Sequence, residues 1–214
     1  MKIGVFDSGV GGESFVGPIR SRIPDAEVIY KTDKDNIPYG NKTPEELLEL
    51  TLPIFKQFEQ EGCQAVLVAC NSVTTNIING LRDNLSIPLV GVEPMVKPGA
   101  EMSGTGVIAV CATPATLDSE RYAQLKRDYG HDVKIVEPDC SDWANLIENN
   151  RQDEIELEEM VSMLSDTNVD VIVLGCTHYH WIQQDLRRLV GERMRVIQPI
   201  HPVLDQLERV ITES

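Results

Sequence analysis

The sequence of 214 residues lacks the features of several large protein classes. No hydrophobic run is long enough to cross a membrane, and the opening residues 2–6 (KIGVF) are typical of a strand, not of a secretory signal. Basic residues are fewer than acidic ones: the chain has 19 Lys and Arg and 34 Asp and Glu, which gives a formal net charge of −15. We therefore expect neither a membrane nor a nucleic acid as a partner, because nucleic-acid-binding surfaces are basic.

Cysteine is scarce and is not arranged in pairs. The chain has five cysteines, an odd number, and no two of them are in a C-x-x-C motif. This pattern excludes a disulfide framework and a zinc-finger type of metal site, and no metal ligands are predicted. A protein of this kind is expected in a reducing cytoplasm.

Two stretches of the chain share one pattern, and it is the most informative feature of the sequence. Residues 65–72 (AVLVACNS) and 171–178 (VIVLGCTH) are each a short apolar run followed by a small residue, a cysteine and polar residues. An unalternated, β-branched run is typical of a strand buried on both faces of a parallel sheet. Ligands bind at the carboxyl ends of such strands. We therefore expect Cys70 and Cys176 at ligand-binding edges, each beside the start of a following helix.

Strands and helices alternate along the whole sequence, which predicts an α/β fold with parallel sheets. The segment Thr43-Pro44-Glu45-Glu46 predicts a helix with Thr43 as N-cap and a capping-box Glu at N3. Other helices are predicted over residues 74–82, 113–127 and 202–211. Strands are predicted over residues 2–6, 26–30, 65–69, 88–92, 105–110, 133–136, 171–174 and 195–197.

The two halves of the chain repeat this scheme. Gly4 aligns with Gly106 and Cys70 with Cys176, at a nearly constant separation. This indicates an internal duplication, which is expected to give two similar parallel-sheet α/β domains related by a pseudo-twofold axis. The predicted boundaries are residues 1–94 with 196–214 for the first domain and 95–195 for the second. The active site is expected in the cleft between them, with the two cysteines on opposite walls.

A buried cysteine is usually a small hydrophobic residue without a chemical role. That interpretation is preferred for Cys63, Cys111 and Cys140, and it would also apply to a lone Cys70. The duplicate at Cys176, with polar neighbours in both copies, favours chemistry for this pair instead.

Two opposed thiols suit the removal of an α-proton from an amino acid and its return to the other face. A nearby helix N-terminus promotes thiolate formation, and general acid/base catalysis requires a group poised near the working pH. Asn71, Ser72 and Thr177 each follow a cysteine closely and are suited to binding carboxylate and ammonium groups. Asp7 and His178 are suited to assisting one cysteine each.

Four motifs together are specific enough to indicate a family. Residues 4–12 (GVFDSGVGG), 38–40 (PYG), 69–72 (ACNS) and 174–179 (LGCTHY) occur in the order found in glutamate racemases. The chain therefore resembles the cofactor-independent aspartate/glutamate racemase superfamily over nearly its whole length. A looser match covers residues 112–116 (ATPAT) with Ser119 and Tyr122.

This resemblance implies an isomerase that interconverts L- and D-glutamate without pyridoxal phosphate or metal and supplies D-glutamate for peptidoglycan. It implies that Cys70 and Cys176 are the acid/base residues, assisted by Asp7 and His178. It adds Glu148 as a further assisting carboxylate, for which a solvated helix carboxylate is the equal alternative. The implied substrate-contacting residues are Asp7, Ser8, Tyr39, Gly40, Asn71, Ser72, Thr177 and His178.

Some alternatives remain open from the sequence. Ser72 stands where the family usually has threonine, and His180 stands where proline is usual. The substrate alternatives are aspartate or another acidic amino acid, although His178 favours glutamate. A cysteine hydrolase using Cys176 and His178 would leave Cys70 unexplained. An inactive binding homologue is the third alternative, and a homodimer is left open.

Overall fold

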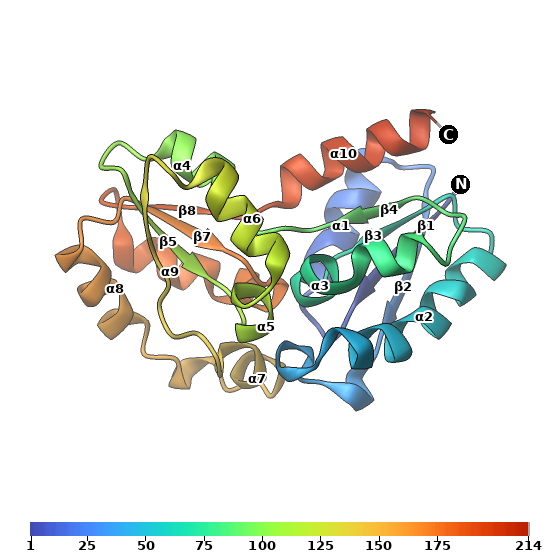
Figure 1. Cartoon of the computed structure of the whole chain (residues 1–214), viewed down its shortest axis with the longest axis horizontal. Helices are drawn as coiled ribbons and strands as arrows, with labels where there is room; N and C mark the ends of the chain where they lie inside the picture. The colour runs from blue at the N-terminus through green and yellow to red at the C-terminus, as the bar shows by residue number, and fades with distance from the viewer. Residues whose placement is uncertain (214) are drawn as a thin grey trace. The chain divides into compact units, whose positions relative to one another are not determined.

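The computed structural model describes residues 1–213, which form two compact units (Figure 1). Unit 1 comprises Met1–Glu93 and the residues from Pro199 on, and unit 2 comprises Pro94–Gln198. The domain boundaries predicted from the sequence lie after residues 94 and 195. Unit 1 is therefore discontinuous in the chain, with unit 2 between its two parts.

Unit 1 is built on a four-stranded sheet in the order β2-β1-β3-β4, and every pair of neighbours is parallel. The carboxyl ends of β1 and β3 lie side by side, because Phe6 pairs with Val68. The strands are β1 (Lys2–Asp7), β2 (Glu27–Thr32), β3 (Ala65–Val68) and β4 (Leu89–Gly91).

Helices cover both faces of this sheet, which explains why β3 has no polar residues. Val66 and Val68 pack in a cluster with aromatic side chains of α2, while Ala65 and Leu67 pack against α1 and α10. The helical elements of unit 1 are α1 (Glu13–Arg22), η1 (Lys34–Asn36), η2 (Tyr39–Asn41), α2 (Pro44–Gln60), α3 (Asn71–Arg82) and α10 (Ile200–Glu213).

The predicted start of α2 is confirmed in detail. The side chain of Thr43 accepts a hydrogen bond from the Glu46 amide at 3.3 Å, and the Thr43 amide donates to Glu46 Oε2 at 2.8 Å. This reciprocal pair satisfies two amides that the helix itself leaves without acceptors.

Unit 2 repeats the topology of unit 1. Its four parallel strands have the order β6-β5-β7-β8, which becomes the order of unit 1 when β5 to β8 are matched to β1 to β4. The predicted duplication of a parallel α/β unit is thereby confirmed. The strands are β5 (Val107–Cys111), β6 (Lys134–Val136), β7 (Val171–Leu174) and β8 (Arg195–Ile197).

The sheet of unit 2 is also covered on both faces. Ile172 and Leu174 of β7 pack with residues of α7, α8 and α9, while Val171 and Val173 pack with Val96 and Tyr122 on the other side. The helical elements are α4 (Val96–Met102), α5 (Pro114–Leu117), α6 (Glu120–Tyr129), α7 (Trp143–Glu148), η3 (Gln152–Glu154), α8 (Leu157–Asp166), η4 (Thr177–Ile182) and α9 (Gln183–Val190).

Three helix predictions differ from the structure. Helix α3 begins at Asn71, directly after Cys70, and not at residue 74. The helix predicted over residues 113–127 is two helices, because Ser119 caps α6 by accepting from the Tyr122 amide at 3.1 Å. Helix α4 was not predicted, since Pro98 and Gly99 within it are poor helix formers.

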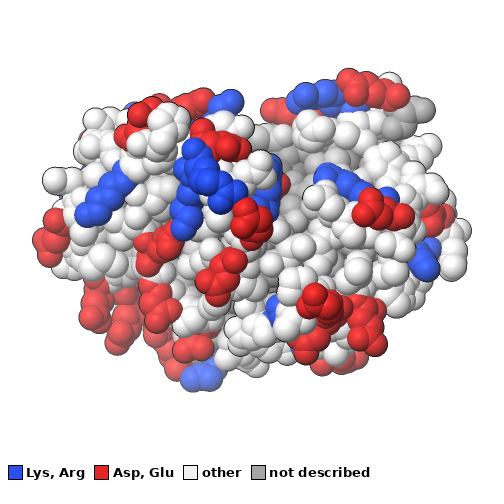
Figure 2. All heavy atoms as spheres, viewed as in Figure 1, with Lys and Arg blue, Asp and Glu red and all other residues white. Residues whose placement is uncertain are grey.

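Charged side chains are scattered over the face drawn in Figure 2, and acidic ones predominate among them. A group of acidic side chains lies over the region of α7 and α8 in unit 2. Among residues 1–213, no helix has both the length and the apolarity needed to span a membrane.

Candidate active site

The thiol of Cys70 lies where β3 meets α3. Cys70 is the residue that precedes α3, it lies two residues beyond the end of β3, and it is 5% exposed. Its Sγ donates to Ser8 Oγ, 3.7 Å away on the neighbouring strand connection. Cys70 is therefore the N-cap residue of α3, although its side chain accepts no hydrogen bond from the helix amides. A cysteine at a helix N-terminus is at a position that favours the thiolate.

Asp7 is held at the end of β1 by a tight turn. It is fully buried, and its Oδ2 accepts from the Gly9 amide at 3.1 Å. Gly12 lies so close that a Cβ on it would be 2.6 Å from the Asp7 Cβ. The glycine in this turn is therefore required for the close approach of the backbone to Asp7.

Tyr39 is oriented by a residue that the sequence analysis did not select. Its hydroxyl donates to Asp33 Oδ2 at 2.6 Å, and Asp33 Oδ1 also accepts from Asn36 at 2.8 Å. Burial, followed by the hydrogen bond to Asp33, raises the pKa of Tyr39 well above its ordinary value, and the charges of Cys70 and Asp7 add to this. Tyr39 is therefore a neutral phenol whose proton is committed to Asp33. The signal that could have identified Asp33 is its position at the carboxyl end of a strand: Asp33 directly follows β2, and Asp7 is the last residue of β1.

Asn71 and Ser72 occupy the first turn of α3 and are each 4% exposed. The side-chain oxygen of Asn71 is buried and has no hydrogen-bond partner among the described residues. A buried acceptor without a donor is costly, so this oxygen is suited to a donor supplied by a ligand. Gly40 lies next to Tyr39 in η2 and is half-buried.

Unit 2 contains a chain of three proton-accepting side chains. Cys176 lies two residues beyond the end of β7, the same distance that separates Cys70 from β3. Its Sγ is 3.8 Å from His178 Nδ1, and His178 Nε2 is 2.7 Å from Glu148 Oε2. The side chains of His178 and Glu148 are 7% and 10% exposed, so Glu148 is not a solvated helix carboxylate.

The direction of these hydrogen bonds follows from the carboxylate. An ionised carboxylate only accepts, so a neutral His178 donates its Nε2 proton to Glu148 and leaves Nδ1 as an acceptor. Nδ1 can then take the proton of the Cys176 thiol. The charge of the resulting imidazolium is balanced by Glu148.

The helix that carries Glu148 is fixed by aromatic residues. Trp143, the first residue of α7, packs edge-on against Tyr179 with ring centroids 5.2 Å apart. The Tyr179 hydroxyl donates to the Cys140 carbonyl oxygen at 2.7 Å, and burial raises the pKa of Tyr179 well above its ordinary value. The sequence did not indicate Trp143, and it indicated Tyr179 only as the last residue of the motif at residues 174–179.

Two more residues of η4 complete this part of unit 2. Thr177 is 2% exposed and directly follows Cys176. His180, which stands where the family usually has proline, lies in η4, and its pKa is lowered to about 4 by burial and then by the charge of His178. His180 is therefore neutral at neutral pH.

The predicted residues thus fall into two groups, one in each unit. Unit 1 holds Asp7, Ser8, Tyr39, Gly40, Cys70, Asn71 and Ser72 at the carboxyl edge of its sheet. Unit 2 holds Glu148, Cys176, Thr177 and His178. The remaining cysteines are buried, as expected, and a hydrogen bond with Cys111 and burial raise the pKa of Cys140. No group of three or more His, Cys, Asp or Glu side chains in residues 1–213 is arranged to hold a metal ion.

Comparison with known proteins identifies the family. The family model described as Asp/Glu/Hydantoin racemase matches residues 14–207. The chain belongs to this family. The resemblance found in its motifs is therefore confirmed, and as a member of the family the chain is an isomerase of the racemase type.

Relatives and solved structures agree with this assignment. A glutamate racemase of Pseudomonas syringae pv. tomato is 38% identical over 99% of this chain and 79% of the relative. The structure of Escherichia coli glutamate racemase in complex with L-glutamate and the activator UDP-MurNAc-Ala matches 100% of this chain and 83% of that chain, with 26% identity and a TM-score of 0.89. The structure of Francisella tularensis glutamate racemase with D-glutamate covers 99% and 81% of the two chains, with 26% identity and a TM-score of 0.82.

Proposed function

We propose that this chain interconverts L- and D-glutamate by two-base proton transfer at Cα, with Cys70 and Cys176 as the two bases. The observation that carries this proposal is the equivalence of the two thiols. Each is buried, and each lies two residues beyond the second strand from one edge of a four-stranded sheet with the same topology. A mechanism with a single nucleophile or base gives no reason for this duplication.

Glutamate is proposed as the substrate because of the relatives. The Pseudomonas protein is a glutamate racemase, and the Escherichia coli and Francisella structures contain L-glutamate and D-glutamate. These cover nearly all of the present chain. Aspartate or another acidic amino acid is the alternative substrate within the same family.

The reaction requires one thiolate and one thiol on opposite faces of Cα. The thiolate removes the Cα proton, the Cα–H electron pair remains on the substrate as a carbanion, and the other thiol donates its proton to the opposite face. The product is the enantiomer, and the two cysteines have exchanged protonation states. The bound substrate carboxylate stabilises the carbanion when backbone amides hold it.

On the Cys176 side, we assign the supporting role to His178 and Glu148. His178 Nδ1 receives the thiol proton and returns it, while Glu148 fixes the ring and balances the imidazolium charge. General acid/base assistance of this kind contributes about 10²- to 10⁴-fold to a rate.

On the Cys70 side, Asp7 is assigned as the assisting carboxylate, and Ser8 as the hydrogen-bond partner of the thiol. The first amides of α3 suit the substrate carboxylate, because a helix leaves them without internal acceptors. The Asn71 side-chain oxygen suits the substrate ammonium. Tyr39, Gly40, Ser72 and Thr177 are assigned as further substrate contacts.

The proposal includes three statements about biology. The reaction uses no pyridoxal phosphate and no metal, because two thiols and a held carboxylate provide the acid/base chemistry. The product D-glutamate serves peptidoglycan synthesis. The site of action is the cytoplasm, where cysteine thiols stay reduced.

The test is incubation of the purified protein with L- or D-glutamate in D2O. Circular dichroism follows the loss of optical activity, and NMR follows deuterium at Cα. We expect racemisation from both enantiomers, and its loss in both Cys70→Ser and Cys176→Ser. A serine hydroxyl keeps the size of the side chain but is far too weak an acid to act as the second base.

Other outcomes point to the alternatives. Turnover of aspartate without turnover of glutamate would change the proposed substrate from glutamate to aspartate. Hydrolysis that survives Cys70→Ser would indicate a cysteine hydrolase that uses Cys176. Binding of glutamate without deuterium at Cα would indicate an inactive binding homologue.

A further inference from the structure

Asp33 joins three segments of unit 1 and has no part in the mechanism proposed above. Its amide donates to the Ser8 carbonyl oxygen at 3.2 Å, in the turn after β1. Its Oδ2 accepts from the Tyr39 hydroxyl of η2 at 2.6 Å, and its Oδ1 accepts from the Asn36 side chain of η1 at 2.8 Å. Asp33 therefore connects the turn that contains Ser8 with the segment that contains Tyr39 and Gly40.

The backbone of Asp33 is fixed by the sheet. Asp33 directly follows Thr32, the last residue of β2, and Thr32 is the register partner of Asp7 at the end of β1. Tyr30 of the same strand donates its hydroxyl to the Gly9 carbonyl oxygen at 2.6 Å. The carboxyl end of β2 therefore holds the turn after β1 at two consecutive carbonyl groups, and the Asp33 side chain extends from a rigid element.

The Asp33 carboxylate does not cap the helical turn that follows it. An aspartate directly before a helix normally accepts from the first amides of that helix. Asp33 precedes η1, but its side chain makes no such hydrogen bond. Its two oxygens accept from the side chains of Tyr39 and Asn36 instead. The carboxylate is therefore oriented toward Tyr39 and does not serve local helix formation.

Tyr39 transmits this orientation to the candidate active site. Its ring packs near that of Phe6, with centroids 6.4 Å apart, and it belongs to the same buried cluster as Cys70. Tyr39 is 2% exposed, and a buried hydroxyl that loses its acceptor is costly. Removal of the Asp33 carboxylate is therefore expected to displace Tyr39 toward water, together with the adjacent Gly40.

We propose that Asp33 is a positioning residue, which anchors the Tyr39 hydroxyl and so holds the segment of Tyr39 and Gly40 in a fixed relation to Ser8 for substrate binding. This inference rests on the proposed function, which assigns Ser8, Tyr39 and Gly40 as substrate contacts. Because Asp33 acts through Tyr39, its loss weakens the binding of substrate and transition state alike. KM is then expected to rise more than kcat falls.

The first test is the kinetics of glutamate racemisation in Asp33→Ala, followed by circular dichroism. We expect KM to rise about tenfold and kcat to fall less than about threefold. Partial unfolding would give a different result, because it lowers the amount of active protein, and thus the apparent kcat, without changing KM. Asp33→Asn keeps an oxygen that can accept from Tyr39 but lacks the charge, so its KM is expected to lie between those of the wild type and Asp33→Ala.

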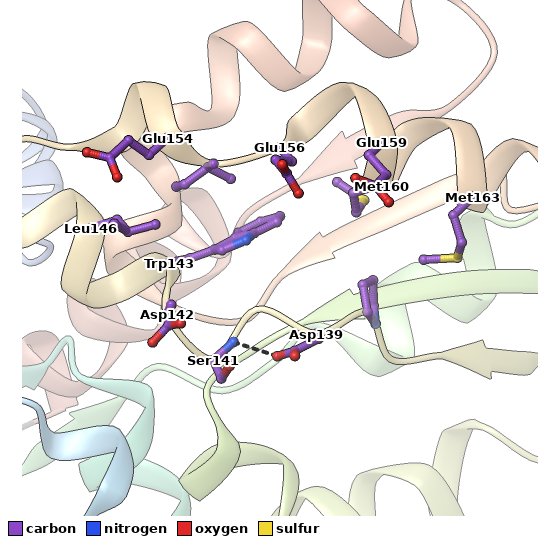
Figure 3. A pocket seen from close by; sticks show the side chains of 12 residues that line it. Asp139, Ser141, Asp142, Trp143, Leu146, Glu154, Glu156, Glu159, Met160 and Met163 are labelled. Atoms are coloured by element: carbon purple, nitrogen blue, oxygen red, sulfur yellow. Dashed lines mark hydrogen bonds between the residues drawn. The ribbon is translucent and has the colours of Figure 1, made fainter.

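The matched control is Asp139→Asn in unit 2. Asp139 lines a pocket there, and its carboxylate accepts from the Ser141 amide at 3.0 Å, as Figure 3 shows. It therefore holds a turn by a hydrogen bond, but it is exposed and belongs to neither group of candidate site residues. Its KM and kcat are expected to stay within about twofold of the wild type.

A double variant tests whether Asp33 acts through Tyr39. Tyr39→Phe removes only the hydroxyl and is expected to raise KM as Asp33→Ala does. In the double variant, KM is expected to stay within about twofold of the more affected single variant, because both substitutions remove the same hydrogen bond. Multiplication of the two effects would mean that Asp33 acts by another route, and it would overturn the proposal.

Hydrogen exchange tests the anchor in the absence of substrate. The segment 36–42 includes the Lys42 amide, which donates to the Tyr39 carbonyl oxygen at 3.2 Å. In Asp33→Ala, mass spectrometry is expected to show exchange about tenfold faster in this segment. Exchange in β3 is expected to remain unchanged, and Asp139→Asn is expected to leave both segments unchanged.

The two measurements distinguish this inference from the proposed function. Unchanged exchange in Asp33→Ala would overturn the anchoring of Tyr39, whether or not the protein is a racemase. Faster exchange with an unchanged KM would mean that the anchored segment does not bind substrate, which would also overturn the proposal. A wild type that racemises no glutamate would overturn the proposed function, and exchange alone would then decide the anchoring.

Discussion

At the scale of single residues, the two thiols are supported differently. Cys176 has an imidazole at 3.8 Å that is itself bonded to a buried carboxylate, whereas Cys70 has a hydroxyl at 3.7 Å and the N-terminus of a twelve-residue helix. In the proposed mechanism, a proton relay assists Cys176 and the electrostatic field of a helix N-terminus assists Cys70. A change in the relay is therefore expected to affect the Cys176 step alone.

Glu148→Gln tests this relay. The amide keeps the shape of the side chain but removes the charge that stabilises imidazolium, so we expect kcat to fall about a hundredfold. The control is Glu101→Gln, an exposed carboxylate on α4 whose loss is expected to leave kcat unchanged. An unchanged kcat in Glu148→Gln would remove this residue from the mechanism.

His180 gives a prediction about acid stability. Its pKa is about 4 in the folded chain, against about 6.5 in the unfolded chain. The unfolded state therefore binds more protons between these values, and stability falls as the pH is lowered from about 6.5 to about 4. We expect His180→Gln to lose less stability over this window, by up to about 3 kcal/mol. Urea unfolding at a series of pH values measures the free energy of unfolding of the wild type and of His180→Gln. The same decrease in both proteins between about pH 6.5 and 4 would contradict the prediction.

At the scale of elements, apolar patterning was sufficient for the sheets but not for every helix. The runs that became β3 and β7 were recognisable because both faces of these strands are buried. Helix α4 was not recognisable, since its tertiary contacts offset Pro98 and Gly99. Among the residues of the proposed site, Cys70 and Cys176 could be predicted because each closely follows a run of residues typical of a buried strand. The bond between His178 and Glu148 joins residues 30 apart and leaves no local pattern, so only the resemblance suggested Glu148.

The turn after β1 gives a prediction at this scale. Gly12→Ala would place a Cβ 2.6 Å from Asp7 Cβ, so the turn must shift. We expect a loss of about 1 to 3 kcal/mol in unfolding free energy and a drop in kcat/KM. Gly80→Ala is the matched control. Its Cβ would meet Leu48 at 3.6 Å, an ordinary contact, and a helix interior favours alanine by about 0.5 to 1 kcal/mol. Equal effects of the two variants would contradict this account.

At the scale of the whole molecule, the dominant feature is the net charge of −15. Repulsion among these charges opposes the compact state, and salt screens it. We expect the melting temperature to rise by a few degrees between about 10 and 200 mM NaCl. A decrease would mean that attractive ion pairs, such as Lys126 with Glu137 at 2.9 Å, outweigh the repulsion.

The discontinuity of unit 1 also governs the order in which the molecule is completed during synthesis. Helix α10 supplies Ile200, Val203, Leu204 and Leu207 to the cluster beneath β1 and β3, yet it is translated after all of unit 2. A nascent chain can therefore finish unit 2 while one face of the first sheet is covered by α1 but still lacks α10. The part of this face that α10 later buries, in the cluster with Ile3, Val5 and Leu67, is the surface that a chaperone would meet on the ribosome.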